Sequence, residues 1–241
     1  MLLNKNNKRT AAKKEQPKSF VNQRRLVLGR HSPFALQEAY KTLRTNIRFS
    51  LRGDGCKKIC ITSSNSGEGK SITLLNLAIS FAETGKKVLL VDADLRRPAI
   101  ARLMAEKATP GLSNVLADLC QEEEAVRKDV QPNLDILYSG DVPPNPSELL
   151  SSERMQAFIE KMASQYDYIL IDTPPVNVVS DSCIVANLTD GVLLLVRQGR
   201  TRKDAVKKAV AHLQLTGANV LGYVLNGVES GLNAYYTYEQ Q

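Results

Sequence analysis

A glycine-rich segment that contains a lysine and a serine is the strongest chemical signal in this sequence of 241 residues. It reads SSNSGEGKS over residues 63–71, after a short apolar run and before a helical pattern. Gly67 and Gly69 allow the backbone to curve closely round an anion, and the first turn of a helix presents free N–H groups to it. The lysine can reach terminal phosphates and the serine hydroxyl can bind Mg²⁺. The segment predicts a nucleotide-binding site made by Ser66, Gly67, Glu68, Gly69, Lys70, Ser71 and Ile72.

Three aspartates follow two other apolar runs that have the composition of buried strands. Asp92 and Asp94 come after a run of Val and Leu, and Asp172 ends a run of Ile and Leu. Ligands of parallel sheets bind at the carboxyl ends of the strands, so these carboxylates are expected to converge on whatever Lys70 and Ser71 hold. Mg²⁺ takes oxygen ligands and keeps several waters, so one carboxylate, a hydroxyl and phosphate oxygens suffice. Spacing alone leaves open which carboxylate binds the metal and which orients a nucleophile.

Strand and helix patterns alternate through most of the chain. Several strands are continuous apolar runs, which is typical of a parallel sheet covered by helices on both faces. The predicted fold class is α/β, a mostly parallel sheet between helices, in a single domain. The predicted strands cover residues 58–62, 87–92, 133–138, 168–172, 191–196 and 220–225, and the predicted helices 70–84, 151–165, 178–188 and 201–215.

The chain divides into a basic N-terminal arm (residues 1–31), a P-loop domain (32–228) and a tyrosine-rich tail (229–241). The domain is expected to open with a helix over residues 32–52, with Ser32 as N-cap and a proline in the first position. Apolar residues recur at helical spacing and predict one buried stripe: Leu36, Tyr40, Leu43, Ile47 and Leu51. Charged residues fall on another face of this helix.

The charge distribution argues against a nucleic-acid partner. The first 30 residues hold nine Lys or Arg against one acid, +8, whereas the whole chain carries +7, so the rest carries −1. A nucleic-acid groove needs its Lys and Arg on the folded body. The arm is either a solvated leader or a segment attracted to an anionic membrane surface.

Apolar runs and cysteines indicate a cytoplasmic protein. No run approaches the roughly 20 residues that span a bilayer, and Met1–Leu3 is too short for a signal peptide. The four cysteines show no CxxC spacing and there are two histidines, so neither a zinc site nor a disulfide framework is expected. The cysteines are expected to act as small core residues.

Several segments together resemble a known family. SSNSGEGKS, LLVDADLRRP and ILIDTPP are similar to the Walker A, Walker A′ and Walker B motifs of the bacterial protein-tyrosine kinases of capsule and exopolysaccharide synthesis. The resemblance extends to PPNPSELLSS, to the SPFALQEAYKTLRTNIR helix and to the terminal tyrosines, and covers residues 32–241. It implies a P-loop fold like that of the partitioning ATPases, protein-tyrosine kinase activity, and ATP and Mg²⁺ as cofactors.

The resemblance also implies roles for single residues. Lys70, Asp92 and Asp94 would be catalytic, with Asp92 nearest the incoming hydroxyl. Ser71, Asp94 and Asp172 would hold Mg²⁺. Tyrosine has a pKa of about 10, but phosphoryl transfer depends mostly on positioning and charge neutralisation, so a weak carboxylate acceptor is enough. The expected acceptors, phosphorylated between subunits, are Tyr235, Tyr236 and Tyr238.

The implied partners include other copies of the chain. In the family an ExxRxxR helix face joins subunits into a ring, and the matching residues here are Glu38, Lys41 and Arg44. Lys41 stands where the family usually has arginine, and without the planar guanidinium the contact is expected to be weaker. Pairing of Glu38 with Lys41 inside the helix is the alternative. A second expected partner is the cytoplasmic tail of a separate membrane activator of the chain-length or co-polymerase type, which would recruit the chain to the inner face of the membrane. A third is a phosphotyrosine phosphatase.

Two other functions use the same kind of loop. A partitioning or positioning ATPase carries a signature lysine five residues before the loop lysine, where this chain has Asn65. A regulatory partner of a polysaccharide export system would bind ATP without phosphorylating tyrosine. The tyrosines of the tail favour the kinase.

Overall fold

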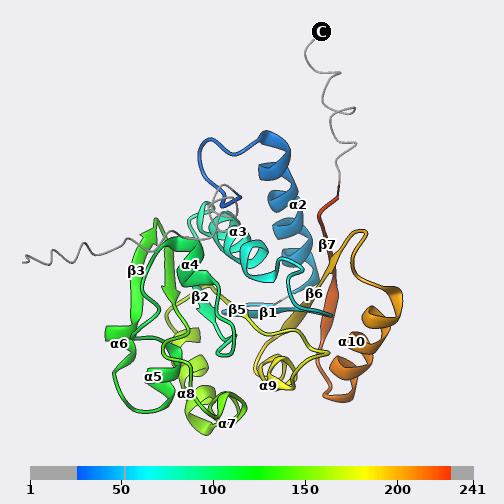
Figure 1. The fold of residues 1–241 in the computed structure, drawn as a ribbon. Helices are drawn as coiled ribbons and strands as arrows, with labels where there is room; N and C mark the ends of the chain where they lie inside the picture. The colour runs from blue at the N-terminus through cyan, green and yellow to red at the C-terminus, as the bar shows by residue number, and fades with distance from the viewer. Residues whose placement is uncertain (1–25, 52, 229–241) are drawn as a thin grey trace, which may run out of the picture.

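A seven-stranded sheet with helices on both faces forms the molecule (Figure 1). The computed structural model describes residues 26–51 and 53–228. The strand order is β3-β4-β2-β5-β1-β6-β7, and every neighbouring pair is parallel except β3 and β4. The strands are β1 (Lys57–Ser63), β2 (Val88–Asp92), β3 (Val126–Gln131), β4 (Leu134–Leu137), β5 (Tyr168–Asp172), β6 (Gly191–Arg197) and β7 (Val220–Asn226). The helices are α2 (Phe34–Ser50), α3 (Lys70–Ala82), α4 (Ile100–Met104), α5 (Leu112–Leu116), α6 (Glu122–Ala125), α7 (Pro146–Leu150), α8 (Glu153–Ala163), α9 (Asp181–Ala186) and α10 (Lys203–Leu215).

Successive residues of the central strands fill two separate cores. In β2, Val88 and Leu90 pack on the side of α2, α3 and α4, whereas Leu89 and Val91 pack on the side of α5, α8, α9 and α10. All four side chains are fully buried. Because both faces of the strand are covered, its sequence is a continuous apolar run. The predicted α/β class with a mostly parallel sheet is confirmed.

The topology brings the three predicted motifs to one edge of the sheet. β5 lies between β1 and β2, and its last residue, Asp172, is in register with Asp92 on one side and Ile61 on the other. Since these strands are parallel, the loops that follow them leave from the same edge. The glycine-rich segment of residues 63–71, called the phosphate loop from here on, and all three aspartates therefore share that edge.

The chain from the end of β2 to about Gln131 was expected to be a helical and loop region, and it contains the short helices α4, α5 and α6. Its last residues, 126–131, instead form β3, which pairs antiparallel with β4 at the edge of the sheet. A proline-rich loop was expected over residues 142–146, and the short helix α7 begins at its last residue, Pro146. The helix predicted over 151–165 begins only at Glu153, because the Ser152 side chain accepts a hydrogen bond from the N–H of Met155 and caps α8. Edge position explains why β3 was missed, since Val126 is its one buried residue and the others are exposed or partly buried and form no apolar run.

The start of α2 differs from the prediction. The N-cap residue is Pro33, not Ser32. Ser32 Oγ instead accepts a hydrogen bond from the N–H of Gly29 at 3.0 Å, so this side chain closes the preceding turn. The predicted apolar stripe is confirmed: Ile47 is buried, and the other four residues pack against the same core.

Residues 26–31, predicted to belong to the arm, are attached to the folded body. Leu28 is buried, and its N–H donates to Asn76 Oδ1 on α3 at 2.8 Å. Asn76 Nδ2 donates to the carbonyl of Leu26 at 2.8 Å and to the Tyr40 hydroxyl at 3.2 Å. The folded body therefore begins before residue 32. The rest of the predicted arm, residues 1–25, lies outside the described residues.

The four cysteines meet the prediction of small core residues only in part. Cys60 is buried in the core, whereas Cys56, Cys120 and Cys183 are half-buried at its margin, and all four are free. The prediction of core cysteines therefore holds fully for Cys60 alone.

No helix in the described part of the chain has the length and apolar character needed to cross a bilayer.

Asn76→Ala is expected to lower the free energy of unfolding by about 1–3 kcal/mol, because it leaves a buried N–H and a carbonyl without partners. Asn46→Ala on the exposed side of α2 is the matched control and should change stability by less than about 0.5 kcal/mol. Urea unfolding measures both. Equal stability of the two variants would show that residues 26–28 are not attached through Asn76.

Candidate active site

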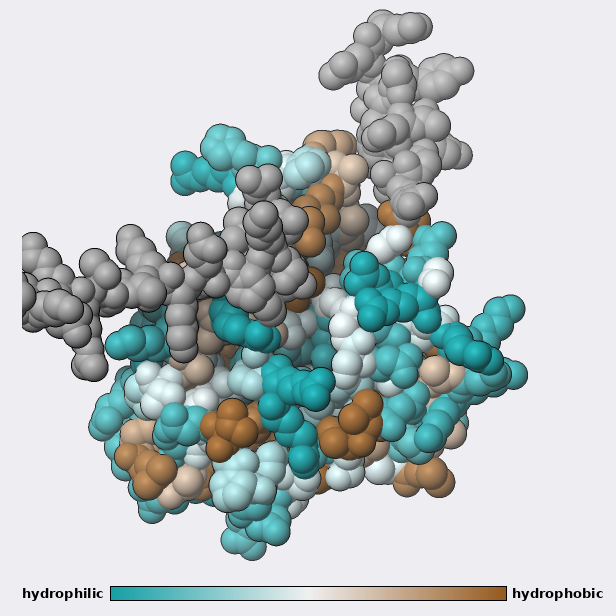
Figure 2. Space-filling view, viewed as in Figure 1, coloured by the Kyte–Doolittle hydropathy of each residue, from teal (hydrophilic) through white to brown (hydrophobic). Residues whose placement is uncertain are grey.

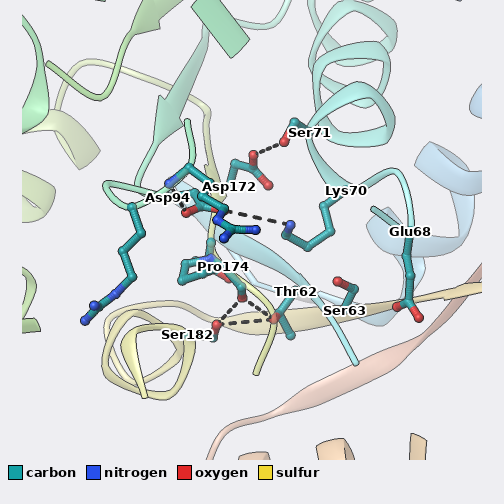
Figure 3. A network of polar contacts seen from close by, with 12 residues as sticks. Thr62, Ser63, Glu68, Lys70, Ser71, Asp94, Asp172, Pro174 and Ser182 are labelled. Carbon is teal, nitrogen blue, oxygen red and sulfur yellow. Dashed lines mark hydrogen bonds and ion pairs between the residues drawn. The ribbon is translucent and has the colours of Figure 1, made fainter. Parts of the chain in front are cut away.

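The phosphate loop joins β1 to α3 and holds Lys70 at the edge of the sheet, where its side chain points toward Asp94 (Figure 3). Gly67 and Gly69 have φ angles of 76° and 102°, values that glycine adopts without strain. Lys70 is 8% exposed, and its Nζ lies 4.0 Å from Asp94 Oδ2. The first N–H groups of a helix have no intrahelical partners. The loop thus offers N–H donors beside a cationic side chain, as an anion site requires.

Ser71 and Asp172 form the second part of the site. Ser71 Oγ donates a hydrogen bond to Asp172 Oδ2, while the buried Asp172 Oδ1 has no hydrogen-bond partner. Burial raises the pKa of Asp172 to about 6, against the opposing effects of Lys70 and of the serine hydroxyl. An unpaired buried carboxylate oxygen is unfavourable. A divalent cation beside it would remove that cost.

The donor set suits a cation that keeps part of its water shell. Within the described residues, no group of three or more His, Cys, Asp or Glu side chains is placed to hold a metal ion on its own. Mg²⁺ is commonly held by one or two carboxylates together with substrate phosphates and water. The hydroxyl of Ser71 and the free oxygen of Asp172 therefore fit Mg²⁺ better than a metal that needs a complete protein cage.

Asp92 and Asp94 lie in different environments. Asp92 is fully buried, and its carboxylate accepts hydrogen bonds from the N–H groups of Asp94 at 3.3 Å and Ile100 at 3.1 Å. Burial, and then the charge of Asp172, raises the pKa of Asp92 well above its usual range. Asp94 accepts from the N–H of Arg97 at 3.0 Å and faces the loop lysine. Asp94 thus borders the site, whereas Asp92 lies beneath it and holds the loop that carries Asp94.

A salt bridge that the sequence did not predict fixes the loop after β2. Arg96 Nε and Nη2 donate to the two oxygens of Asp181 at 2.7 and 3.1 Å, and Ser147 Oγ donates to the same carboxylate at 2.8 Å. The Asp181 side chain is fully buried at the start of α9. This bidentate pair joins the aspartate-bearing loop to α9 and α7. Arg96 and Ser147 belong to segments that carried the family resemblance, but only the fold shows that they meet.

Glu68 was predicted to bind nucleotide, yet its side chain is directed away from Lys70 (Figure 3), toward Thr201 in the loop after β6. It is 1% exposed, and its carboxylate accepts hydrogen bonds from Thr201 Oγ1 and from the side chain of Asn65. Ile72 packs its side chain against the core. Glu68 and Ile72 can therefore offer backbone groups to a nucleotide. Ser66 is exposed on the loop.

The predicted oligomerisation residues make contacts within the chain. Lys41 Nζ lies 2.7 Å from Glu38 Oε1, the pairing within the helix that the alternative expects. Arg44 Nη1 donates to the carbonyl of Ser80 and, at 3.0 Å, to its hydroxyl, which joins α2 to α3. The surface over α2 also includes hydrophobic area (Figure 2), with Phe49 76% exposed. Arg44 is thus engaged within a single chain, whereas Phe49 at the end of α2 remains exposed.

A separate cavity lies beside the amino ends of β2, β4 and β5, away from the phosphate loop. Its lining includes Lys128, Asp135 and Tyr166. The Tyr166 hydroxyl donates to Asp135 at 2.6 Å, and Lys128 Nζ lies 3.0 Å from the same carboxylate. These groups satisfy one another, so the cavity offers less unpaired chemistry than the edge that holds Asp172.

Comparison with known proteins agrees with the geometry. A family model described as an AAA domain matches residues 56–213. The tyrosine-protein kinase YwqD of Bacillus subtilis (strain 168) is 41% identical over 201 residues, which cover 83% of this chain and 85% of that protein. The chain belongs to the bacterial tyrosine-protein kinases. A putative member of this kinase family, CapB of Staphylococcus aureus, is 34% identical over 84% of this chain and 89% of its own length.

Solved structures of kinases support the same family. The chimerical protein CapA2B2 aligns with a TM-score of 0.78 and 35% identity, over 83% of this chain and 87% of that one. The kinase domain of the Escherichia coli tyrosine kinase ETK aligns with a TM-score of 0.77 and 34% identity, over 80% and 76%. The septum site-determining protein MinD from Pyrococcus horikoshii, at 24% identity and a TM-score of 0.61 over 73% and 72%, shares the fold. The predicted family and P-loop fold are confirmed, and the positioning ATPases are related through fold alone.

The predicted phosphorylation sites of this kinase, Tyr235, Tyr236 and Tyr238, lie outside the described residues. They stay predictions. The last described strand, β7, ends at Asn226, so the tail follows it directly in sequence.

Asp172→Asn is expected to stabilise the kinase when Mg²⁺ and nucleotide are absent. The folded-state pKa of about 6 exceeds the roughly 3.9 of an unfolded aspartate, so the folded state resists ionisation. Wild type should therefore lose stability relative to the variant as pH rises from about 4 to about 6, by up to ~3 kcal/mol, and the difference should be constant above that.

Urea unfolding of both proteins across this pH range measures the difference. Asp167→Asn is the control. The hydrogen bond from Lys86 lowers the pKa of Asp167, so in this pair the wild type should gain stability relative to the variant as pH rises. A stability difference between wild type and Asp172→Asn that does not change with pH would contradict the placement of Asp172 in a buried, uncompensated site.

Proposed function

We propose that this tyrosine kinase uses ATP and Mg²⁺ to phosphorylate the C-terminal tyrosines of a neighbouring subunit, and that this regulates capsular or exopolysaccharide synthesis or export. The observation that carries the proposal is the group of Lys70, Ser71 and Asp172, in which a buried carboxylate oxygen has no partner. The kinase relatives at 34–41% identity support tyrosine as the acceptor.

The residues of the loop fit a magnesium nucleotide. When bound, the metal would neutralise charge on the phosphates during transfer. Ser71 and Asp172 supply hard oxygen ligands, and the pKa of Asp172 near 6 leaves it ionised at neutral pH. Lys70 and the first N–H groups of α3 serve the phosphates. Asp94 would contact the metal directly or through water, and its position 4.0 Å from the lysine supports this role.

The transfer step needs an acceptor for one proton. The tyrosine oxygen forms a bond to the terminal phosphorus, the bond from that phosphorus to the bridging oxygen breaks, ADP leaves, and the hydroxyl proton passes to a carboxylate. Asp92 is the residue proposed nearest the hydroxyl. Because its carboxylate is fully buried, direct acceptance requires the loop after β2 to open. Its two backbone hydrogen bonds support a further part in holding Asp94.

The proposed partners follow from the same family. Copies of the chain would assemble into a ring through α2, with Glu38, Lys41 and Arg44 at or near the contact, and the exposed side chain of Phe49 supports an apolar contribution. The activator would be the cytoplasmic tail of a separate membrane protein, which would recruit the kinase to the inner face of the membrane. A phosphotyrosine phosphatase would reverse the modification.

Lys70→Met is expected to reduce phosphotyrosine formation by at least 100-fold, because it removes the cation that faces the phosphates. Incubation with labelled ATP, followed by phosphosite mapping, measures it. Label on the tail tyrosines of wild type supports the kinase, whereas release of free phosphate without phosphotyrosine would assign the site to an ATPase. Binding without either product would indicate a regulatory partner.

A mixing experiment tests transfer between subunits. Lys70→Met keeps the tail but lacks activity, and the Tyr235/Tyr236/Tyr238→Phe variant keeps the site but lacks acceptors. Neither should be labelled alone, whereas the mixture should carry phosphotyrosine on the Lys70→Met chain. A mixture as poorly labelled as its parts, beside a labelled wild type, would show that each subunit phosphorylates its own tail.

A further inference from the structure

Glu68 is a buried acid inside a loop that is shaped to bind anions. Its side chain is 1% exposed. A carboxylate that faces bound phosphates would repel them, but the Glu68 side chain is directed away from Lys70 and accepts hydrogen bonds from Thr201 and Asn65. Its part in the loop therefore lies in the contacts that its side chain makes.

Those contacts join the loop to the ends of two strands. Thr201 Oγ1, after β6, donates to Glu68 Oε1 at 2.6 Å, and Asn226 Nδ2, at the end of β7, donates to the carbonyl of Glu68 at 2.8 Å. Arg197 Nη1 donates to the carbonyl of Gly67 at 3.2 Å. Thr201 Oγ1 also accepts from the N–H of Arg197 at 2.9 Å. Three side chains of β6, β7 and the loop after β6 thus hold two successive residues of the phosphate loop.

The approach of Asn226 is close enough to restrict the neighbouring residue. A Cβ atom on Gly69 would collide with Asn226 Nδ2, and the backbone of Gly69 is left-handed, with φ of 102°. The glycine therefore serves two needs, a turn into α3 and room for the asparagine. The loop is shaped against β7 as well as by its own sequence.

We propose that Glu68, Thr201 and Asn226 form a clamp that holds the phosphate loop in its binding shape before nucleotide arrives. Thr201 and Asn226 are then positioning residues, which act through Glu68 without touching nucleotide. A preformed site loses less conformational entropy on binding, so loss of the clamp weakens nucleotide affinity more than it weakens the fold. Because the tail follows β7 in sequence, the clamp also joins the phosphate loop to the strand that precedes the tail.

Thr201→Val removes the hydroxyl and keeps the shape of the side chain. It should weaken binding of a fluorescent ADP analogue with Mg²⁺ by about tenfold, the effect expected for losing a hydrogen bond to a charged group. Thr201→Ser should restore affinity to within about twofold of wild type. Thr84→Val is the matched control: its hydroxyl donates to the carbonyl of Phe81 at 2.6 Å at the far end of α3, and its removal should leave affinity unchanged.

A double-mutant cycle tests the route through Glu68. If Thr201 acts through that carboxylate, Thr201→Val should have no further effect on affinity in a Glu68→Ala background. Additive losses, or a Thr201→Val variant within twofold of wild type, would overturn the clamp. The comparison of Val with Ser at position 201 decides the matter even where Glu68→Ala fails to fold.

The clamp rests on the proposed nucleotide binding but not on tyrosine transfer, so the two can fail separately. A wild-type chain that does not bind the ADP analogue would contradict the proposed function itself, and the clamp with it. A wild-type chain that binds, beside a Thr201→Val variant that binds equally well, would contradict the clamp alone.

Discussion

The active site depends on negative charge that is buried with too little compensation. Asp92 and Asp172 sit opposite each other on adjacent strands, and both are fully buried. Lys70 lies 4.0 Å from Asp94 and lowers the pKa of Asp172, but not enough to offset burial. Burial raises the pKa of both carboxyl groups. Such an arrangement is unfavourable on its own, and a bound divalent cation would offset the negative charge. The proposed binding of metal and nucleotide would therefore stabilise the fold.

Two contacts on opposite flanks keep that edge in shape. The Arg96–Asp181 pair holds the loop after β2 from the side of α9, and Thr201 and Asn226 hold the phosphate loop from the side of β7. Neither contact involves an atom that would touch phosphate, and each joins segments far apart in sequence. Positioning is the main source of catalysis in phosphoryl transfer, so such contacts between loops are part of the machinery of the kinase.

The sequence predicted best those features that arise from local chemistry. β5 was bounded correctly at Tyr168 and Asp172, because a strand buried on both faces is an apolar run ended by a polar residue. β3 was not predicted, since an edge strand has no such run. The direction of Glu68 and the meeting of Arg96 with Asp181 were also beyond prediction, because each is decided by packing between segments more than 80 residues apart.

A structure of the kinase with Mg²⁺ and a non-hydrolysable ATP analogue tests the central claim most directly. In that structure we expect the hydrogen bond from Ser71 to Asp172 to be replaced by contacts of both side chains with the metal, with Ser71 Oγ about 2.1 Å from it. We also expect Lys70 to contact the terminal phosphates. A structure in which Asp172 keeps its hydrogen bond to Ser71 while the analogue binds elsewhere would contradict that claim.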